Sequence, residues 1–451
     1  MNILVLNGSP KGDNSITLQT VKYLEIVKPG HSWEVLHVGA RIRAYEKDFA
    51  PAKAALEKAE LILFVYPVYT FIAPYQMHRF IELMKAAGVN VAGKFASQIS
   101  TSKHFYDVTA QRYIQDNAQD LGLKYIRGLS ADMDDLTTQK GRQEAEKFWD
   151  YVCWCCENGV SEPVPVKLPA GERHLAEVPA DSNDDKPGNV VIVTDCEKDN
   201  LPLQQMIDGF RAVFPRKTRV VNIREYPFRG GCLGCFNCAV SGKCIYTDKF
   251  DAFLREEIQS GESIVDACSV KDHSMGAAFK LYDDRQFCNG HRTVTMGMPM
   301  GYLISGDYSR EMNLQTIVEG RAQVGGNFLA GVATDEGDVN AAVDRMAAAL
   351  NYALENQYAP PQNFLGVGGM KVFRDLIWLM QGMMKADHKF YKAHGQYDFP
   401  QKKWPRMLAM YLVGAMMSSE KLKKKAGGKM TEGMLMPYTK VLKEAREKHQ
   451  Q

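Results

Sequence analysis

Four cysteines, Cys232, Cys235, Cys238 and Cys244, fall within thirteen residues of this chain. Their spacing, C-x2-C-x2-C-x5-C, places four potential thiolate ligands on one glycine-containing loop. Iron–sulfur clusters require four sulfur ligands on a loop that can wrap around them. Zinc also accepts four cysteines, although its ligands more often come as two separated C-x2-C pairs. The spacing favours a [4Fe–4S] cluster and leaves two alternatives: zinc, or a metal-free loop with a structural or thiol-redox role.

A second candidate site follows the apolar run 3–6 near the amino terminus. Its loop, GSPKGDNSIT, combines glycines that let a backbone approach an anion with hydroxyl groups and one lysine. The alternative is a plain strand–helix turn in which Asn14 or Ser15 only caps the helix. The residues that could bind a phosphate are Ser9, Lys11, Asn14, Ser15, Ile16 and Thr17.

A third group follows the apolar run 61–65. This turn is rich in aromatic residues and could hold a flat ring by stacking and by backbone amides; the alternative is a hydrophobic loop at the edge of the core. Its candidate residues are Pro67, Val68, Tyr69, Thr70 and Phe71. A weaker candidate loop follows the apolar run 95–100 and contributes Thr101, Ser102 and His104.

Together, GSPK…NSIT and YPVYTFIAP…FIE resemble the NADPH-dependent FMN reductase branch of the flavodoxin-like superfamily, over roughly the first 150 residues. The resemblance implies that the first loop binds the FMN phosphate and that the second lies along the isoalloxazine ring. Lys11 stands where that family usually has arginine, so charge is kept and bidentate contact is lost. The cysteine loop, continuing through Lys243 to Asp248, resembles the compact cluster motif of iron–sulfur flavoproteins. The implied cofactors are FMN and a [4Fe–4S] cluster.

The elements that must position these residues alternate between strand and helix. Strands are expected at 3–6, 33–38, 61–65, 95–100 and 125–128, and helices around 18–24 and at 51–59, 77–87, 108–121 and 138–156. Such alternation predicts a doubly wound parallel sheet.

The same alternation restarts after residues 158–188, which are rich in proline, glycine and charge and are interpreted as a linker. Strands are expected at 190–194, 218–223, 263–268, 293–298, 302–305 and 328–334, and helices at 201–213, 249–259, 275–287, 311–324 and 339–355. The predicted fold class is α/β: two tandem flavodoxin-like doubly wound parallel sheets plus a C-terminal helical extension. The predicted domains are 1–157 (FMN-binding), 189–357 (cysteine loop) and 358–451 (extension).

The two units differ at their binding loops. The loop 194–200 has three acids that would repel phosphate, and the loop 268–273 lacks the proline–valine–tyrosine turn of the first unit. We therefore expect the second unit to have kept the fold and lost its flavin. The working hypothesis places FMN in the first domain and the cluster in the second, facing each other across a pseudo-twofold interface.

The composition fits a soluble globular protein, with 45% apolar residues, 24% charged residues and a net charge of +2 that gives no overall attraction to nucleic acid. Residues 371–451 are basic, and the tail from Pro360 onward shows helical apolar patterns. This tail is interpreted as a cover on the two domains, with a lid for a bulky apolar substrate or a membrane-surface face (Lys421, Lys423, Lys424 and Lys425) as alternatives. No targeting segment is visible, and the apolar run 407–417 is about half the roughly 20 residues that cross a bilayer. We expect a cytoplasmic protein.

The resemblance implies a flavin-dependent oxidoreductase that moves electrons between NAD(P)H, or a reduced ferredoxin-type carrier, and a small-molecule or protein acceptor. Because the flavin performs the chemistry, no catalytic acid or base is assigned. The alternatives are a non-enzymatic electron-carrier flavoprotein and a zinc-binding or regulatory flavodoxin-like protein. A homodimer is possible under each of these interpretations.

Overall fold

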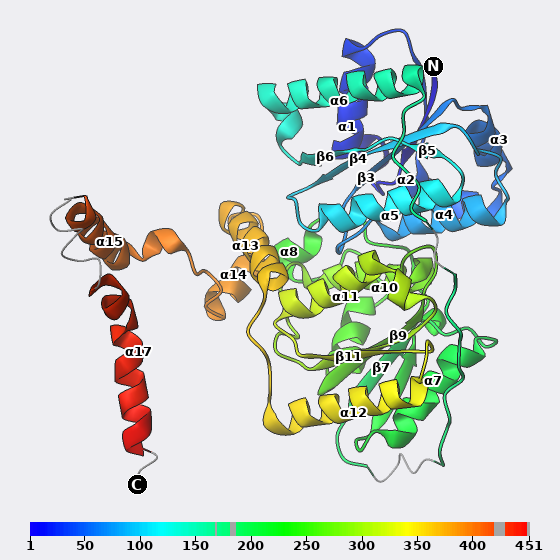
Figure 1. The fold of residues 1–451 in the computed structure, drawn as a ribbon. Coiled ribbons are helices and arrows are strands. Elements are labelled where there is room, and N and C mark those ends of the chain that lie inside the picture. The colour runs from blue at the N-terminus through cyan, green and yellow to red at the C-terminus, as the bar shows by residue number, and fades with distance from the viewer. Residues whose placement is uncertain (167–168, 181–185, 419–428, 449–451) are drawn as a thin grey trace. The chain divides into compact units, whose positions relative to one another are not determined.

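The computed structural model describes residues 1–166, 169–180, 186–418 and 429–448. Its contacts divide the chain into two units, Met1–Phe390 and Tyr391–Gln451. The first unit contains two parallel sheets, each with helices on both faces (Figure 1). The predicted fold class, two tandem doubly wound sheets followed by C-terminal helices, is confirmed.

The first sheet has six strands in the order β2-β1-β3-β4-β5, with β6 beside β4, and every pairing is parallel. Its strands are β1 (Asn2–Asn7), β2 (Ser32–Leu36), β3 (Leu61–Pro67), β4 (Phe95–Ser102), β5 (Lys124–Tyr125) and β6 (Leu129–Asp132). Its helices are α1 (Ile16–Val27), α2 (Val38–Lys47), α3 (Ala50–Lys58), α4 (Tyr75–Ala86), α5 (Asp107–Asp120) and α6 (Gln139–Asn158). Helices α1 and α6 cover one face, and α4 and α5 the other (Figure 1).

The second sheet has five strands in the order β11-β10-β9-β7-β8, again all parallel. Its strands are β7 (Val190–Thr194), β8 (Thr218–Asn222), β9 (Ser263–Ser269), β10 (Met300–Ser305) and β11 (Leu329–Thr334). Its helices are α7 (Leu201–Val213), α8 (Asn237–Ser241), α9 (Phe250–Phe253), α10 (Gly276–Arg285), α11 (Met312–Gly325) and α12 (Val339–Asn356). Read from the outer strand, β8-β7-β9-β10-β11 repeats the order β2-β1-β3-β4-β5 of the first sheet.

The central strands follow from their sequence. Strands β1 and β3 are near-continuous apolar runs, and residues 3–6 and 61–66 are all buried. A strand covered by helices on both faces buries consecutive side chains instead of alternating ones. Helix α6 instead buries one face through Ala145, Trp149 and Val152, at the spacing of a helix.

Helix α2 was missed by the sequence prediction, which extended a strand to residue 38. The strand ends at Leu36, and α2 begins two residues later. This helix buries Val38, Ile42 and Tyr45 against the core, although its polar composition gives only a weak helical pattern and Arg41 departs from helical geometry.

The expected strand at 293–298 is wrong: these residues form consecutive turns. Gly297 adopts a φ of +81°, which a strand does not use. The Nδ2 group of Asn327 donates to the carbonyls of Thr295 (2.9 Å) and Met298 (2.7 Å). This side chain satisfies backbone groups that a neighbouring strand would otherwise bond.

The described part of segment 158–188 contacts both halves: the amide of Glu162 donates to the Tyr125 carbonyl of the first sheet (2.7 Å), and residues 173–174 bond to the second half. Arg173 forms ion pairs with Asp335 (2.7 Å) and Asp307 (2.6 Å), and the amide of His174 donates to the Asp335 carbonyl. The proposed domain boundaries stay a prediction.

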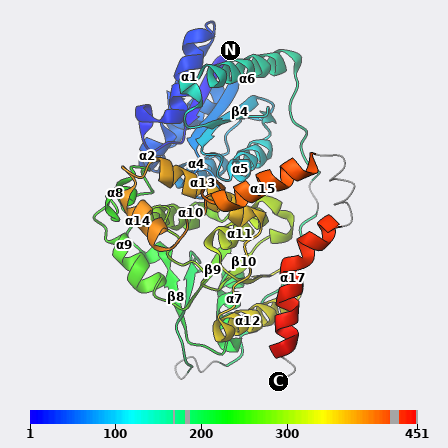
Figure 2. The ribbon, with the colours of Figure 1, turned by 90° about the vertical axis from the view of Figure 1, so that its left-hand side faces the viewer.

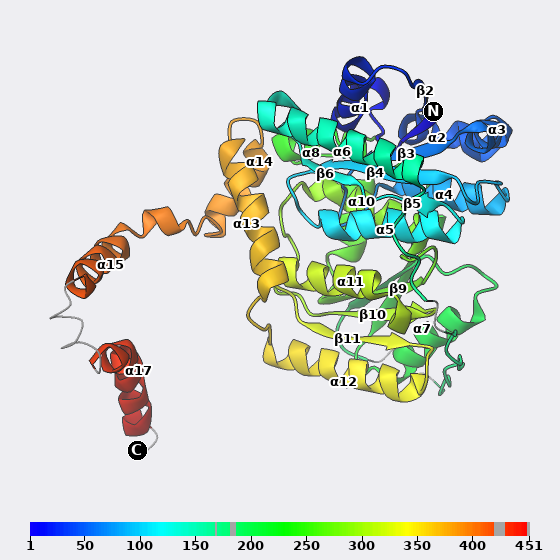
Figure 3. The ribbon, with the colours of Figure 1, turned by 45° about the horizontal axis from the view of Figure 1, so that its top comes forward.

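The two halves of the first unit meet through α4 and α5 on one side and α10 and α11 on the other (Figure 3). Their hydrogen bonds are reciprocal. Asp284 of α10 accepts from the amide of Tyr75 at the start of α4 (2.7 Å), and Glu82 of α4 accepts from the amide of Ala277 at the start of α10 (2.9 Å). Each helix therefore places a carboxylate at the positive N-terminal end of the other.

The C-terminal extension is helical: α13 (Phe364–Leu379), α14 (Lys385–Ala393), α15 (Trp404–Met417) and α17 (Lys429–Lys448). Helix α13 packs against α11 (Figure 2). The four lysines of the suggested membrane-surface face lie outside the described residues. Among the helices that the structure describes, none has the length and apolar character needed to span a bilayer.

Candidate functional site

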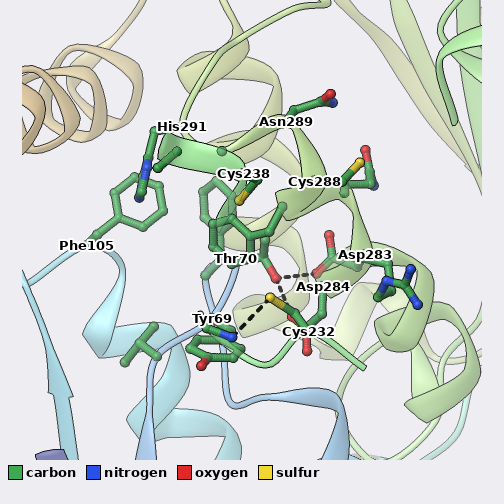
Figure 4. Close-up of a pocket in the computed structure, with 18 of the residues that line it drawn as sticks. Tyr69, Thr70, Phe105, Cys232, Cys238, Asp283, Asp284, Cys288, Asn289 and His291 are labelled. Carbon is green, nitrogen blue, oxygen red and sulfur yellow. Dashed lines mark hydrogen bonds between the residues drawn. The ribbon is translucent and has the colours of Figure 1, made fainter. Parts of the chain in front are cut away.

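One cavity of about 410 Å³ brings the predicted loops together (Figure 4). Of the fourteen residues predicted to bind a cofactor, twelve line it: Ser9, Lys11, Ser15, Ile16, Thr17, Pro67, Val68, Tyr69, Thr70, Phe71, Thr101 and Ser102. Asn14 and His104 do not line it. All four cysteines of the second unit line the same cavity.

The glycine–serine loop ends at the N-terminus of α1. The hydroxyl of Ser9 accepts from the amide of Lys11 (3.3 Å), and that of Ser15 caps α1 by accepting from Leu18 (3.3 Å). The hydroxyls of Thr17 and Thr101 lie 2.5 Å apart and join this loop to the end of β4. Free first-turn amides and the helix dipole make such an end suitable for an anion.

The position of this loop depends on Gly39 of α2. A Cβ atom at Gly39 would lie 2.3 Å from the Gly8 carbonyl oxygen and 2.4 Å from that of Ser9. These contacts are with backbone, which cannot move aside cheaply. Sequence reasoning missed this support because it missed α2.

The aromatic turn after β3 is a two-residue hairpin. Tyr69 and Ile72 exchange backbone hydrogen bonds (2.8 and 3.1 Å), while Thr70 and Phe71 have φ values of 40° and 72°. Positive φ at both central residues matches a turn that ordinarily selects glycine or asparagine, so non-glycine residues here store strain.

Helix α10 of the second half stabilises this strained turn. The Thr70 hydroxyl lies 2.7 Å from Asp283 and 2.8 Å from Asp284, and Lys280 donates to the Tyr69 carbonyl (2.9 Å) (Figure 4). Lys280 also pairs with both carboxylates, and all three side chains are buried. Burial raises the pKa of Asp283, but Arg321 and Lys280 outweigh this and hold it below the usual value. The turn therefore rests on a charge-balanced network from the other half.

The cysteine loop is held by Arg285. Its guanidinium pairs with both oxygens of Asp248 (2.8 Å each), donates to the Gly230 carbonyl (2.8 Å) and lies 4.4 Å from the Tyr246 ring centroid. A buried bidentate pair of this kind fixes orientation as well as charge. Arg285 thus anchors the loop that carries the cysteines.

The four thiols do not form a metal-holding arrangement. Across residues 1–166, 169–180, 186–418 and 429–448, no group of three or more His, Cys, Asp or Glu side chains is placed to hold a metal ion. Burial raises the pKa of Cys232, and it raises that of Cys238 to about 11. Without a metal ion, the buried thiols of Cys232 and Cys238 are therefore neutral.

The second half and the extension add lining residues that the sequence did not indicate. Cys288 is a fifth cysteine at the cavity, and burial raises its pKa to about 12. Phe373 of α13 stacks on Phe105 with centroids 4.4 Å apart. Helix α13 therefore forms part of the cavity wall. This position agrees with both the cover and the lid interpretation of the C-terminal extension.

His291 also lines the cavity and lies 3.0 Å from the buried Asp387 carboxylate, which also pairs with Arg292 (2.9 Å). In the sequence this histidine is isolated, which favours a surface or capping residue. Its partner lies 96 residues away, and no local pattern indicates that contact.

Comparison with known proteins gives the following. The family model described as flavodoxin-like fold matches residues 1–147. No curated protein matches the chain. Similar solved structures include an NADH:FMN oxidoreductase (EMOB) in its apo form (17% identity, 36% of this chain and 91% of that one, TM-score 0.30). Others are a putative quinone reductase from Klebsiella pneumoniae (15%, 37% and 88%, 0.29) and an FMN-dependent NADH-azoreductase from Bacillus anthracis with FMN (14%, 34% and 98%, 0.27). The family model thus matches the part of the chain that forms the first sheet, and the second sheet, which that model does not cover, repeats its strand order.

Proposed function

We propose that this protein is an FMN-dependent oxidoreductase that moves electrons between NAD(P)H, or a reduced ferredoxin-type carrier, and an acceptor. One observation carries the proposal: the glycine–serine loop and the aromatic turn line one cavity, together with residues of the second half. An anion site at a helix N-terminus and a neighbouring aromatic turn match the two ends of FMN.

The residues present fit this cofactor. Ser9, Ser15 and Thr17, with the N-terminus of α1, would bind the phosphate, and Lys11 would supply a positive charge. Tyr69 and Phe71 would lie along the ring. When bound, FMN accepts a hydride and passes electrons onward singly or in pairs. The protein orients the ring through the strained turn that Lys280 and Asp284 stabilise, and α13 restricts access of water from one side.

A [4Fe–4S] cluster on Cys232, Cys235, Cys238 and Cys244 is a separate part of the proposal. Its support is the spacing of the cysteines and their place on the cavity that also contains the flavin loops. The placement of the thiols argues against it, so no electron-transfer step is derived through the cluster. Substituting Cys235 with serine should remove any iron yet leave FMN bound, and loss of both together would contradict separate sites.

The test is anaerobic purification of the full chain, followed by a visible spectrum, an iron assay and titration with FMN. A yellow protein that binds FMN and oxidises NADH or NADPH with a quinone supports the proposal. Slow, partner-dependent oxidation alone would instead favour an electron carrier. A colourless protein that does not bind added FMN would contradict both. A cytoplasmic location stays a prediction.

A further inference from the structure

The cavity extends from the flavin loops into the second half, where the polar residues that line it include Asp266, Tyr302 and Arg321. Asp266 of β9 and Tyr302 of β10 are partners in the strand register, and Arg321 comes from α11. The Arg321 guanidinium lies 5.4 Å from the Phe71 ring, so these residues begin next to the aromatic turn.

Polar atoms of these residues lack partners. Oδ1 of Asp266, the hydroxyl of Tyr302, and Nε and Nη2 of Arg321 have no hydrogen bond within the described structure. Asp266 is 6% exposed and Tyr302 is 2% exposed. Leaving a buried polar group unsatisfied is costly, so several together on one cavity require an explanation.

The first half has no such cluster. Counted back from the turn after each third strand, Asp266 corresponds to Phe64, and the register partner of Phe64 is Gln98. Phe64 is an apolar core residue. Gln98 accepts from the hydroxyl of Tyr66 (2.5 Å), which also lies 3.0 Å from the Ala110 carbonyl. The first half thus has an apolar side chain and a hydrogen-bonded glutamine at these two positions. The second half has Asp266 and Tyr302 there, with unpartnered polar atoms.

The charges around the cluster indicate the kind of ligand. Arg321 pairs with Asp283 (2.6 Å), and Lys280 pairs with both Asp283 and Asp284, so two cations balance two anions. Asp266 is the remaining acid in this group, and burial raises its pKa to about 7. A site without excess positive charge does not favour an anion. Unpaired N–H and O–H donors favour a neutral ligand with an acceptor oxygen.

We propose that Asp266, Tyr302 and Arg321 form a binding subsite for the carbonyl end of a neutral, flat, quinone-type molecule. Its apolar body fits the neighbouring Ile264, Met300 and Val324, which line the same cavity. The binding site stands on the geometry alone. Its assignment to an electron acceptor rests on the proposed function.

Duroquinone is a suitable probe because methyl groups occupy every free ring carbon, which prevents addition of the cysteine thiols. Its dissociation constant is measured by calorimetry on oxidised full-length protein, with and without FMN, so no turnover is needed. FMN affinity is measured separately on the same preparations. Failure of FMN to bind contradicts the proposed function, while titration of the FMN-free protein still reports on the subsite.

Tyr302→Phe removes a hydroxyl that lies beside the Asp266 carboxyl and keeps the aromatic ring, so folding is preserved and duroquinone affinity is expected to fall about fivefold to tenfold. Arg321→Lys keeps the charge beside Asp283 but removes the planar set of donors, and a loss of about tenfold or more is expected. The control is Tyr66→Phe, which removes a partnered hydroxyl outside the subsite and should leave the duroquinone dissociation constant unchanged.

Unchanged duroquinone affinity in both Tyr302→Phe and Arg321→Lys would overturn the proposal. So would equal loss in the Tyr66→Phe control. The anion 2,4,6-trimethylbenzoate, similar in size, is expected to bind more weakly than duroquinone, and tighter binding would contradict a neutral ligand.

Discussion

The turn after the third strand has the same backbone in both halves of this protein. Tyr69 and Ile72 exchange hydrogen bonds of 2.8 and 3.1 Å, and Lys271 and Ser274 exchange bonds of 2.8 and 3.0 Å. In both turns the two central residues have positive φ. The hairpin therefore belongs to the fold, and the difference between the halves lies in the side chains.

Those side chains have different surroundings. Tyr69, Thr70 and Phe71 line the cavity. In the second turn, Asp272 pairs with Lys85 (2.8 Å), and His273 lies 2.9 Å from Asp120 and 3.1 Å from Glu311. Both turns bond to the other half, but only the first also presents its side chains to the cavity.

The loops after the first strands differ in the same way. In the second half, Arg224 pairs with Glu197 (2.6 Å) and donates to the Asp195 carbonyl (2.5 Å). Burial raises the pKa of Asp195 to about 6. In the second half, Asp195 and Glu197, bonded to Arg224, lie where the first half has its glycine–serine loop. A duplicated fold can thus keep one ligand site and convert the other to structural contacts.

The largest expected effect comes from Lys280, which stabilises the first turn. Lys280→Met leaves the buried Asp284 carboxylate without its cation and Asp283 with Arg321 alone, so we expect the free energy of unfolding to fall by about 3–5 kcal/mol. The matched change on the second turn is Lys271→Met. That side chain is 53% exposed and pairs with Glu82, so its loss should cost less than about 1 kcal/mol. Urea unfolding measures both, and equal losses would contradict the distinction.

Asp266 sharpens the comparison with its counterpart Phe64. Its folded pKa of about 7 lies above the ordinary value of 3.8. The native state therefore holds a proton that the unfolded state releases, and stability falls as pH rises from about 4 to about 7. Asp266→Asn should stabilise the protein by roughly 2 kcal/mol at pH 8 and have little effect at pH 4. A benefit that does not depend on pH would mean that Asp266 does not titrate this way.

Gly39 tests the support of the glycine–serine loop. Gly39→Ala forces a Cβ against the backbone of Gly8 and Ser9, so we expect FMN affinity to fall at least tenfold and stability by about 1–2 kcal/mol. Gly368→Ala in α13, with no atom within 4 Å of its Cβ, is the control and should be neutral or slightly stabilising. Fluorescence titration with FMN measures the first effect. Unchanged affinity in Gly39→Ala would show that α2 does not position the loop.

His273 gives the smallest effect and tests the second turn. Burial lowers its pKa, but hydrogen bonds to Asp120 and Glu311 outweigh this and raise it to about 9. The charged form therefore adds stability that is fully present below about pH 6.5 and is lost as pH rises through about 9. His273→Gln should cost about 1 kcal/mol at pH 6 and almost nothing at pH 10. Thermal unfolding at the two pH values measures this, and the same cost at both would argue against a charged contact.

Much of the fold was predictable because its signals are local. Strand β3 is a continuous apolar run, and α7 begins where expected because Asn200 caps it and a proline occupies its first turn. Twelve cavity residues were predictable because they lie at three places where strands end and loops begin, at the carboxyl edge of the sheet where ligands of such sheets bind.

The rest depends on contacts between distant residues. Asp266, Tyr302 and Arg321 come from three different elements. No sequence pattern around any of the three indicates that they lie together. The turns at 293–298 form because Asn327, about thirty residues away, bonds their carbonyls. Cysteine spacing indicates that a loop could wrap a cluster, but the relative positions of the four thiols depend on how the whole loop folds.

The stoichiometry of FMN binding tests the central contrast most directly. Titration of the full chain should give one FMN per chain. Lys11→Glu in the first glycine–serine loop should abolish binding, and Lys198→Glu in the corresponding loop of the second half should leave it intact. Two FMN per chain, or loss of binding in the Lys198 variant alone, would contradict the assignment of one ligand site and one structural copy.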